Sequence, residues 1–560
     1  MREKLSDIIP YVVLASFLIF FYIIPLSFSL SYAVLSNGVL TYRNLAEIFS
    51  KEIFWKALYF TFYQAMLSTL ISLLLGLPGA YILSKYDFPG KRIFSAMSLV
   101  PFMTPSIIVA FGFMMLYGRY GIVTKILRSI GANIVLGEGL IGIVLAHAFF
   151  NTPMVMHIVA SIWTSIDPEL EDVARVLGGR GFYIFRRVIL PQISTGILVA
   201  ALLTFILCFT SFTIVLILGG ARYMTLEVLM YMYYYTLFDK MKASSIALIQ
   251  LLIIAIFSIA YFKVLIKYSI TIKAGGLRIP TYKKLVEKPK DLLHPQKLVL
   301  LIYIIAITIY LFSPYAIIIR DAFFDPIKDT FNLKGFFGIF SLTRNPYYGS
   351  TIVNILINTL YYAFLTVFIA VTLSLLVARA LREKPESSAI LGAITVIPLG
   401  TSSITLGIGL LFAYGGTPLV TVFPWVLIVT SHAAIAMPFA LRTIYNAITQ
   451  IEPEIYEAAD SLGADTLMKV FKIESPLLLP SIATAAALSA ATSLGEFAAT
   501  NLIARGDYIT LTVAMYRLIA TRQFQAAGAM GLVLVILSFL SFLITLKTQE
   551  YLTKTKELPI

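Results

Sequence analysis

Two polar segments with matching chemistry interrupt the long apolar runs of this sequence, at residues 167–191 (the first polar loop) and 452–476 (the second polar loop). Each begins with an acidic residue, a Pro and a Glu, and passes through small residues to a Gly. Basic residues follow, before a Pro 13 positions after that Gly. Acidic residues and Pro suit the first turn of a helix, and Gly suits its end. Each loop is therefore predicted to hold a short surface helix.

Functional candidates in these loops are charged or small. Ala174 with Leu177, and Ala459 with Leu462, have the spacing of one small apolar helix face. An amphipathic connector lying at the lipid interface would explain one such loop, but two copies of one pattern favour a dedicated function. The candidate residues are Glu169, Asp172, Ala174, Gly178 and Pro191 in the first loop, and Glu454, Glu457, Ala458, Ala459, Gly463 and Pro476 in the second.

A second group of candidates lies inside or beside the apolar runs. Glu496 falls within one run, where a charge costs roughly 2.5–3.5 kcal/mol unless it is paired or protonated. Glu496 aligns with Ser211 in an internal repeat, and both are candidates for a substrate pathway, where a carboxylate would suit a cation. A carboxylate held by neighbouring hydroxyl or backbone groups is an equal alternative. Tyr233, in a Tyr-rich run, suits an interfacial aromatic belt or a stacking surface.

The sequence gives little sign of catalysis. His147 and His432 are related by the repeat, but without carboxylates or cysteines nearby they suit hydrogen bonds between helices better than a metal site. No Gly-x-x-x-x-Gly-Lys-Ser/Thr phosphate loop occurs in the sequence. We therefore expect no catalytic residue, no metal ligand and no cofactor in this chain, and any ATP hydrolysis must come from a separate subunit.

The composition shows which elements position these residues. With 59% hydrophobic and 13% charged residues among 560, a water-soluble protein is excluded. Runs of about 20 apolar residues, enough to cross a bilayer as a helix, recur along the chain. We predict an all-α integral membrane protein with about twelve spans: 9–34, 56–84, 93–118, 139–163, 192–219, 244–265, 298–319, 351–381, 388–414, 421–447, 477–503 and 525–546.

The formal charge of +14 reflects membrane topology rather than nucleic-acid binding. When the spans alternate from a cytoplasmic N-terminus, most of the 43 Lys and Arg fall on the cytoplasmic side, as the positive-inside rule requires. Both polar loops then lie on that side. The single cysteine, Cys208, lies within a span and cannot form an intrachain disulfide.

An internal repeat divides the chain into two halves. A shift of 285 residues aligns Gly178 with Gly463 and Phe212 with Phe497, and further upstream the shift becomes 297, which places a longer loop at about 119–138 of the first half. Each half has six spans, an even number, so the repeats are parallel with a pathway between them. The predicted domains are residues 1–266 and 298–560, joined by a cytoplasmic linker at 267–297.

The polar loops resemble the EAA loops of permease subunits in ABC importers. The second loop has Glu457-Ala458-Ala459, Gly463, Ile473 and Pro476; in the first, Asp172 and Val173 depart from the pattern while Gly178 and Pro191 fit. The resemblance covers nearly the whole chain and implies the type I ABC importer permease fold in the plasma membrane. It also implies partners beyond membrane lipid: a homodimer of ABC ATPase subunits, which carry ATP and Mg and receive the two loops, and an extracellular substrate-binding protein.

The substrate remains open at this point. A single chain with both halves is similar to the fused permeases of thiamine and ferric-iron importers. The stretch from Cys208 to Gly220, followed by Thr225-Leu-Glu-Val228, resembles the thiamine branch, whereas Ser493-Leu-Gly-Glu-Phe497 is shared widely among permeases. We expect transport of thiamine or its phosphates by alternating access, with ferric iron as the alternative. A secondary transporter is more distant, because it would not need two EAA loops.

Overall fold

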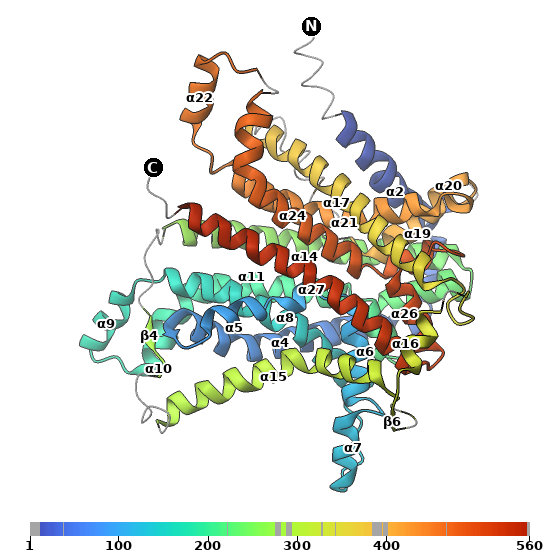
Figure 1. Cartoon of the computed structure of the whole chain (residues 1–560), viewed down its shortest axis with the longest axis horizontal. Helices are drawn as coiled ribbons and strands as arrows, with labels where there is room; N and C mark the ends of the chain where they lie inside the picture. The colour runs from blue at the N-terminus through green and yellow to red at the C-terminus, as the bar shows by residue number, and fades with distance from the viewer. Residues whose placement is uncertain are drawn as a thin grey trace.

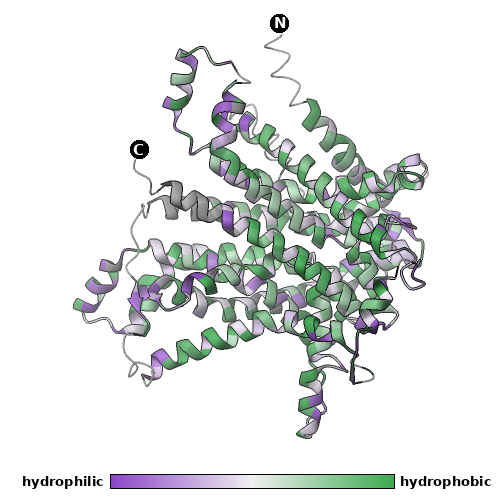
Figure 2. Cartoon of the chain, in the orientation of Figure 1, coloured by the Kyte–Doolittle hydropathy of each residue, from purple (hydrophilic) through white to green (hydrophobic). Residues whose placement is uncertain are grey.

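The computed structural model describes residues 12–36, 39–220, 222–274, 282–286, 294–325, 327, 329–341, 343–383, 395, 401–465 and 468–556. Long helices lie side by side and end at two opposite faces (Figure 1). Their middles are apolar, and polar residues gather towards the ends (Figure 2). Both polar loops and the linker strand β4 lie at the same end of the bundle, on the left in Figure 1.

Eleven of the described helices are long and apolar enough to cross a membrane. They are Val12–Val34, Glu52–Lys85, Ser106–Ser129, Gly139–Ser165, Gly181–Phe209, Lys240–Leu265, Pro295–Phe323, Ile352–Arg382, Pro424–Ile448, Lys472–Gly495 and Phe524–Thr545. The twelfth predicted span, 388–414, is represented by α19 (Ser403–Tyr414), and most of the rest of that span lies outside the described residues.

Three predicted spans are not continuous helices. The span at 93–118 consists of α5 (Lys91–Met97), the 3₁₀ turn η2 (Val100–Met103) and α6 (Ser106–Tyr117), because Pro101 and Pro105 remove backbone donors. The other two breaks are related by the repeat. They separate α11 (Leu190–Phe209) from α12 (Thr213–Leu218), and α24 (Ser475–Gly495) from α25 (Ala498–Ile503).

The two halves exchange their first helices. The N-terminal helix, η1 (Ile19–Ile23) and α2 (Ile24–Val34), packs against α19 of the second half, where the Tyr414 hydroxyl donates to the Phe20 carbonyl at 2.5 Å. Conversely, α15 (Pro295–Phe323) packs against the first half, and Tyr310 donates to the Leu145 carbonyl at 2.5 Å. Figure 1 shows α2 beside α19 and α15 beside α6, so the predicted domains interleave.

The remaining elements complete each half. The other helices are α3 (Arg43–Phe49), α4 (Glu52–Lys85), α7 (Ile122–Ser129), α8 (Gly139–Ser165), α9 (Pro168–Val176), α10 (Gly181–Ile184), η3 (Phe185–Ile189), α13 (Leu226–Tyr231), η4 (Met232–Thr236), α14 (Lys240–Ala274), α16 (Lys334–Ile339), α17 (Ile352–Glu383), α20 (Pro418–Thr421), α21 (Pro424–Ile448), α22 (Pro453–Ser461), η7 (Lys469–Glu474), α26 (Leu511–Ala520) and α27 (Phe524–Lys556). The loop expected at 119–138 contains α7, which projects sideways from the bundle (Figure 1).

Three two-stranded sheets are described. β1 (Leu35–Ser36) pairs with β2 (Val39–Leu40), and β5 (Phe324–Asp325) with β6 (Thr330–Phe331), both antiparallel. β3 (Tyr86–Asp87) pairs in parallel with β4 (Lys283–Lys284) of the linker. The largest buried cluster joins both halves, and a smaller apolar cluster lies beneath each of α9 and α22.

Candidate functional site

Each polar loop contains the predicted short helix, built in nearly the same way. α9 starts at Pro168 and α22 at Pro453. In α9 the side chain of Asp167 caps the helix by accepting a hydrogen bond from the Glu169 N–H at 3.0 Å. The corresponding residue of α22, Glu452, makes no side-chain cap. The acidic side chains at both N-termini complement the helix dipole.

Glycine ends both helices in the same conformation. Gly178 has φ +84° and Gly463 has φ +75°, values that other residues rarely adopt. The next N–H in each loop reaches back to a repeat-related carbonyl, Gly179 to Ala174 at 2.9 Å and Ala464 to Ala459 at 3.0 Å. This is the Schellman arrangement of a helix C-terminus. The predicted helix ends are therefore confirmed.

The exposed surface of the loops differs from the one predicted. Leu177 and Leu462, related by the repeat, are 81% and 88% exposed, whereas Ala459 is buried and Ala174 is half-buried. The predicted shared face of Ala and Leu is thus wrong, because the alanines pack towards the protein while the leucines follow the turn outward. The other candidates are exposed: Glu169, Asp172, Gly178, Pro191, Glu454, Glu457, Ala458, Gly463 and Pro476.

A basic side chain from the second long helix of each half holds the adjacent polar loop. Lys85, at the end of α4, forms an ion pair with Glu171 of α9, and both side chains are mostly buried. Arg382, near the end of α17, lies 3.9 Å from the ring centroid of Tyr456 in α22 and donates to the Ile451 carbonyl at 3.0 Å. Lys85 and Arg382 are related by the 297-residue shift. Sequence reasoning missed both, although that shift would have aligned them.

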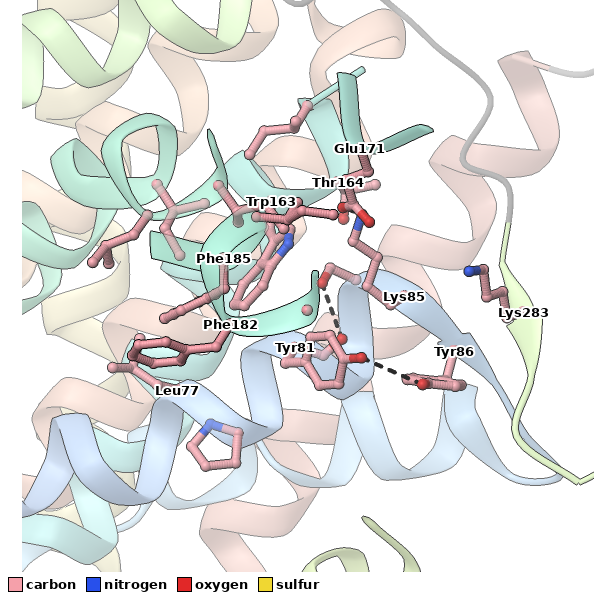
Figure 3. A pocket seen from close by; sticks show the side chains of 18 of the residues that line it. Leu77, Tyr81, Lys85, Tyr86, Trp163, Thr164, Glu171, Phe182, Phe185 and Lys283 are labelled. Atoms are coloured by element: carbon pink, nitrogen blue, oxygen red, sulfur yellow. Dashed lines mark hydrogen bonds and ion pairs between the residues drawn. The ribbon is translucent and has the colours of Figure 1, made fainter. Parts of the chain in front are cut away.

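A cavity of about 1700 Å³ lies beneath the first polar loop (Figure 3). Its wall combines the aromatic rings of Tyr81, Trp163 and Phe185 with the Lys85–Glu171 pair, and Lys283 of the linker lies at its other side. Tyr81 packs against Trp163 with ring centroids 5.4 Å apart. The loop is therefore supported by aromatic packing as well as by the ion pair.

At the junction between the halves, Glu496 lies at the break after α24 and not inside a continuous span. Its carboxylate accepts hydrogen bonds from the N–H groups of Ala499 at 2.8 Å and Thr500 at 3.0 Å, which caps α25. His432 Nε2 lies 3.2 Å from the same carboxylate. This geometry supports the alternative of a carboxylate held by neighbouring groups; a role in the pathway stays a prediction.

Ser211 occupies the matching break of the first half, between α11 and α12. The residues that follow the two sites, Phe212 and Phe497, meet with nearly parallel rings, 6.0 Å between centroids and 16° between planes. Both rings are buried. The repeat relates these two phenylalanines, so their contact lies where the two broken helices face each other across the halves.

The two other predicted polar sites behave differently. Tyr233 is buried in η4, where Lys242 Nζ lies 5.9 Å from its ring centroid. Among the described residues, the ring contacts of Phe212 and Phe497 are with each other, Tyr231 and Tyr516, and not with Tyr233. His147 hydrogen-bonds to Ser68 at 3.1 Å and His432 to Ser493 at 2.8 Å, which confirms the predicted bonds between helices.

Sequence reasoning missed the role of Glu227, a fully buried carboxylate in α13. It accepts hydrogen bonds from Gln250 and, across the halves, from Ser402 at 2.7 Å. The motif from Thr225 to Val228 contains this residue, but composition alone gave no sign that its carboxylate would face the second half.

The fold is that of a membrane protein built from two interleaved repeats, each with a polar helix at the same face. This architecture indicates a membrane transport protein. The family model described as binding-protein-dependent transport system inner membrane component matches the chain twice, at residues 72–270 and 335–554. The chain therefore belongs to this family: it is a multi-pass permease of the plasma membrane and a transport component.

Relatives of similar length are known. The chain is 29% identical over 551 residues to the thiamine transport system permease protein ThiP of Haemophilus influenzae, with 97% of each chain covered. It is 26% identical over 505 residues to ThiP of Escherichia coli, with 90% of each covered. A solved bacterial ABC transporter involved in the import of the acidic polysaccharide alginate matches 49% of this chain and 96% of that chain, at 15% identity and a TM-score of 0.39.

Proposed function

We propose that this chain is the permease subunit of an ATP-driven importer and that its substrate is thiamine or a thiamine phosphate. The observation that carries the proposal is similarity over nearly the full length to permeases named for thiamine transport. The double family match supports one chain that supplies both halves of the pathway.

The exposed polar loops support docking of a separate ATPase. A homodimer of ATPase subunits would present two equivalent surfaces, and this chain offers two loops with the same helix ends and the same outward leucines. ATP and Mg belong to those subunits in this proposal, and the chain itself is not an enzyme. An extracellular binding protein delivers the substrate at the opposite face.

Alternating access follows from where the loops and the junction lie. Lys85 and Arg382 connect the loops to α4 and α17, and the breaks at Ser211 and Glu496 meet between the halves. When the ATPase dimer closes and opens, the loops move with it, the long helices follow, and the Phe212–Phe497 contact separates and re-forms. The proposed boundaries are 1–266 and 298–560, with the linker between them.

The test is ATP-dependent uptake in proteoliposomes that hold the full chain, its ATPase and its binding protein. We expect uptake of radiolabelled thiamine only with ATP and the ATPase present. Uptake of ferric iron instead of thiamine would replace the substrate assignment and leave the importer assignment standing. Uptake driven by an ion gradient without the ATPase would contradict the importer assignment itself.

A further inference from the structure

Five aromatic rings form a continuous ladder across the junction of the halves. Tyr231 stacks on Tyr235 with centroids 5.2 Å apart and planes 9° apart, and it also contacts Phe212 at 5.2 Å. Phe212 meets Phe497 at 6.0 Å, and Phe497 meets Tyr516 at 5.0 Å. Tyr235 is 54% exposed while the two phenylalanines are buried, so the ladder leads from the surface into the junction.

The ladder is symmetric at its centre and asymmetric at its end. The 285-residue shift relates Phe212 to Phe497 and Tyr231 to Tyr516, but it places Ala520 opposite Tyr235. Asn501 of the second half donates a hydrogen bond to the Tyr231 hydroxyl at 3.3 Å, which ties the ladder across the halves. Tyr235 lies just before α14, which runs back to the end of the bundle that holds the linker and both polar loops (Figure 1). The exposed end of the ladder therefore lies at the opposite end, the predicted extracellular side.

The chemistry of these rings suits one kind of ligand. The face of an aromatic ring attracts a cation, and it stacks on flat heteroaromatic rings. The buried Glu496 carboxylate, next to Phe497 in the chain, lies at the same junction, but His432 at 3.2 Å and the Ala499 N–H already engage it. The rings themselves would therefore recognise the cation. Arg517, a cation that follows Tyr516 in the chain, directs its guanidinium to the Tyr348 carbonyl, to which it donates at 2.9 Å.

We propose that the ladder Tyr235–Tyr231–Phe212–Phe497–Tyr516 is a binding path for a flat, positively charged heteroaromatic ligand. This deepens the proposed function, since thiamine carries a thiazolium cation and a pyrimidine ring, and it rests on that function for the identity of the physiological ligand. As the halves separate, the rings of the ladder would lose contact with one another and would contact the rings of the substrate instead.

The test measures direct binding of N-methylquinolinium, a flat cation, to the full chain with its ATPase in lipid nanodiscs. We expect Tyr231→Leu and Tyr235→Leu to raise the Kd about three- to tenfold, the range expected for lost cation–π contacts. Tyr231→Phe, which keeps the ring, should bind like the parent protein. Neutral quinoline should bind more weakly than the cation.

A stacked pair elsewhere serves as the matched control. Tyr59 and Tyr63 on α4 stack at 5.9 Å and 7°, with both rings exposed. Tyr63→Leu should leave the Kd unchanged, and retention of the ATPase subunit by the purified chain shows that each variant is folded. Equal Kd values for the parent, Tyr231→Leu and Tyr235→Leu would overturn the inference, and so would equal losses in Tyr63→Leu.

Thiamine uptake separates this inference from the proposed function. If the parent protein takes up thiamine and the ladder variants still bind the cation normally, the inference fails while the function stands. If the parent takes up no thiamine but cation binding depends on Tyr231 and Tyr235, the assigned substrate falls and the ladder remains a site for another flat cation.

Discussion

The two polar loops share a backbone but differ in how they are held. Both helices begin at Pro and end at a Gly of positive φ. The first is held by the Lys85–Glu171 ion pair, whereas the second is held by Arg382 against the ring of Tyr456. Glu171 and Tyr456 are equivalent positions in the 285-residue repeat, as Lys85 and Arg382 are in the 297-residue repeat.

The comparison shows which part of the loop attachment is shared by the two halves and which part varies. A cation at the end of the second long helix is present in both halves, but its partner is an anion in one and an aromatic ring in the other. Both arrangements bind a cation in a partly buried place. What is retained is therefore a link between a spanning helix and the loop, and not a particular kind of contact.

The largest expected effect comes from filling the space beside the terminal glycines. Among the described residues, neither Gly178 nor Gly463 has a neighbouring atom within 4 Å of where a Cβ would stand, which leaves space there for a docking partner. Gly178→Trp and Gly463→Trp should each abolish ATP-dependent uptake while the chain stays folded in the membrane. Gly463→Ala is the control, since it adds backbone strain of about 1 kcal/mol but little bulk. Normal ATPase association and uptake in the Trp variants would show that the loops do not dock.

The next largest effect comes from removing each basic residue. Lys85→Met leaves Glu171 mostly buried, with Arg175 at 3.5 Å as its remaining cation among the described residues, and should weaken the loop's attachment by about 1–3 kcal/mol. Arg382→Met should cost less, about 0.5–2 kcal/mol. The ratio of substrate transported to ATP hydrolysed measures the coupling, and it should fall further for Lys85→Met. An equal ratio in both variants and the parent would mean that neither contact transmits motion.

Exchanging the chemistry sharpens the comparison. The double variant Lys85→Arg with Glu171→Tyr gives the first half the pair found in the second. We expect coupling close to that of the parent, and better than in Glu171→Tyr alone, where Lys85 reaches the ring less well than the planar guanidinium of Arg. Coupling as poor as in Lys85→Met would mean that the first loop requires an ion pair.

The smallest effect concerns pH. Burial, with a further contribution from the Glu474 carboxylate, raises the pKa of Tyr456 to about 12, against about 10 for an unfolded chain. The folded protein thus favours the neutral phenol of Tyr456. The stability that this phenol contributes to the folded protein is fully present below pH 10 and is lost only as the pH rises towards 12. Coupling should be the same at pH 7 and pH 9.5, in the parent and in Tyr456→Phe. A loss at pH 9.5 in the parent alone would contradict this.

The sequence predicted those features that repeat or have a regular period. Apolar runs predicted the spans, and the shared pattern around Gly178 and Gly463 predicted both surface helices and their ends. The broken helices at Ser211 and Glu496 were missed, because an apolar run looks the same whether or not a carboxylate caps a new helix inside it. The outward turn of Leu177 and Leu462 was also missed, because it depends on the left-handed glycine that follows and not on helical spacing.

Contacts between distant segments could not be predicted in the same way. The exchange of α2 and α15 between the halves depends on packing over hundreds of residues, and Tyr310 meets the Leu145 carbonyl only in the folded chain. The sequence indicated one part of the aromatic ladder, the Tyr-rich run at 231–235, but not its contacts with the phenylalanines. Which of its rings point to Phe212 depended on the π-helical turn η4.

The central claim, that both loops dock the ATPase, is tested most directly by cross-linking. The only native cysteine, Cys208, is buried, so a cysteine placed at Leu177 or Leu462 reacts selectively. Each variant with one added cysteine, reconstituted with its ATPase, should cross-link to that subunit through a short bifunctional reagent, and ATP should change the yield at both positions. Cross-linking at neither position, with the complex intact, would contradict the account; cross-linking at one alone would mean that a single loop makes the connection.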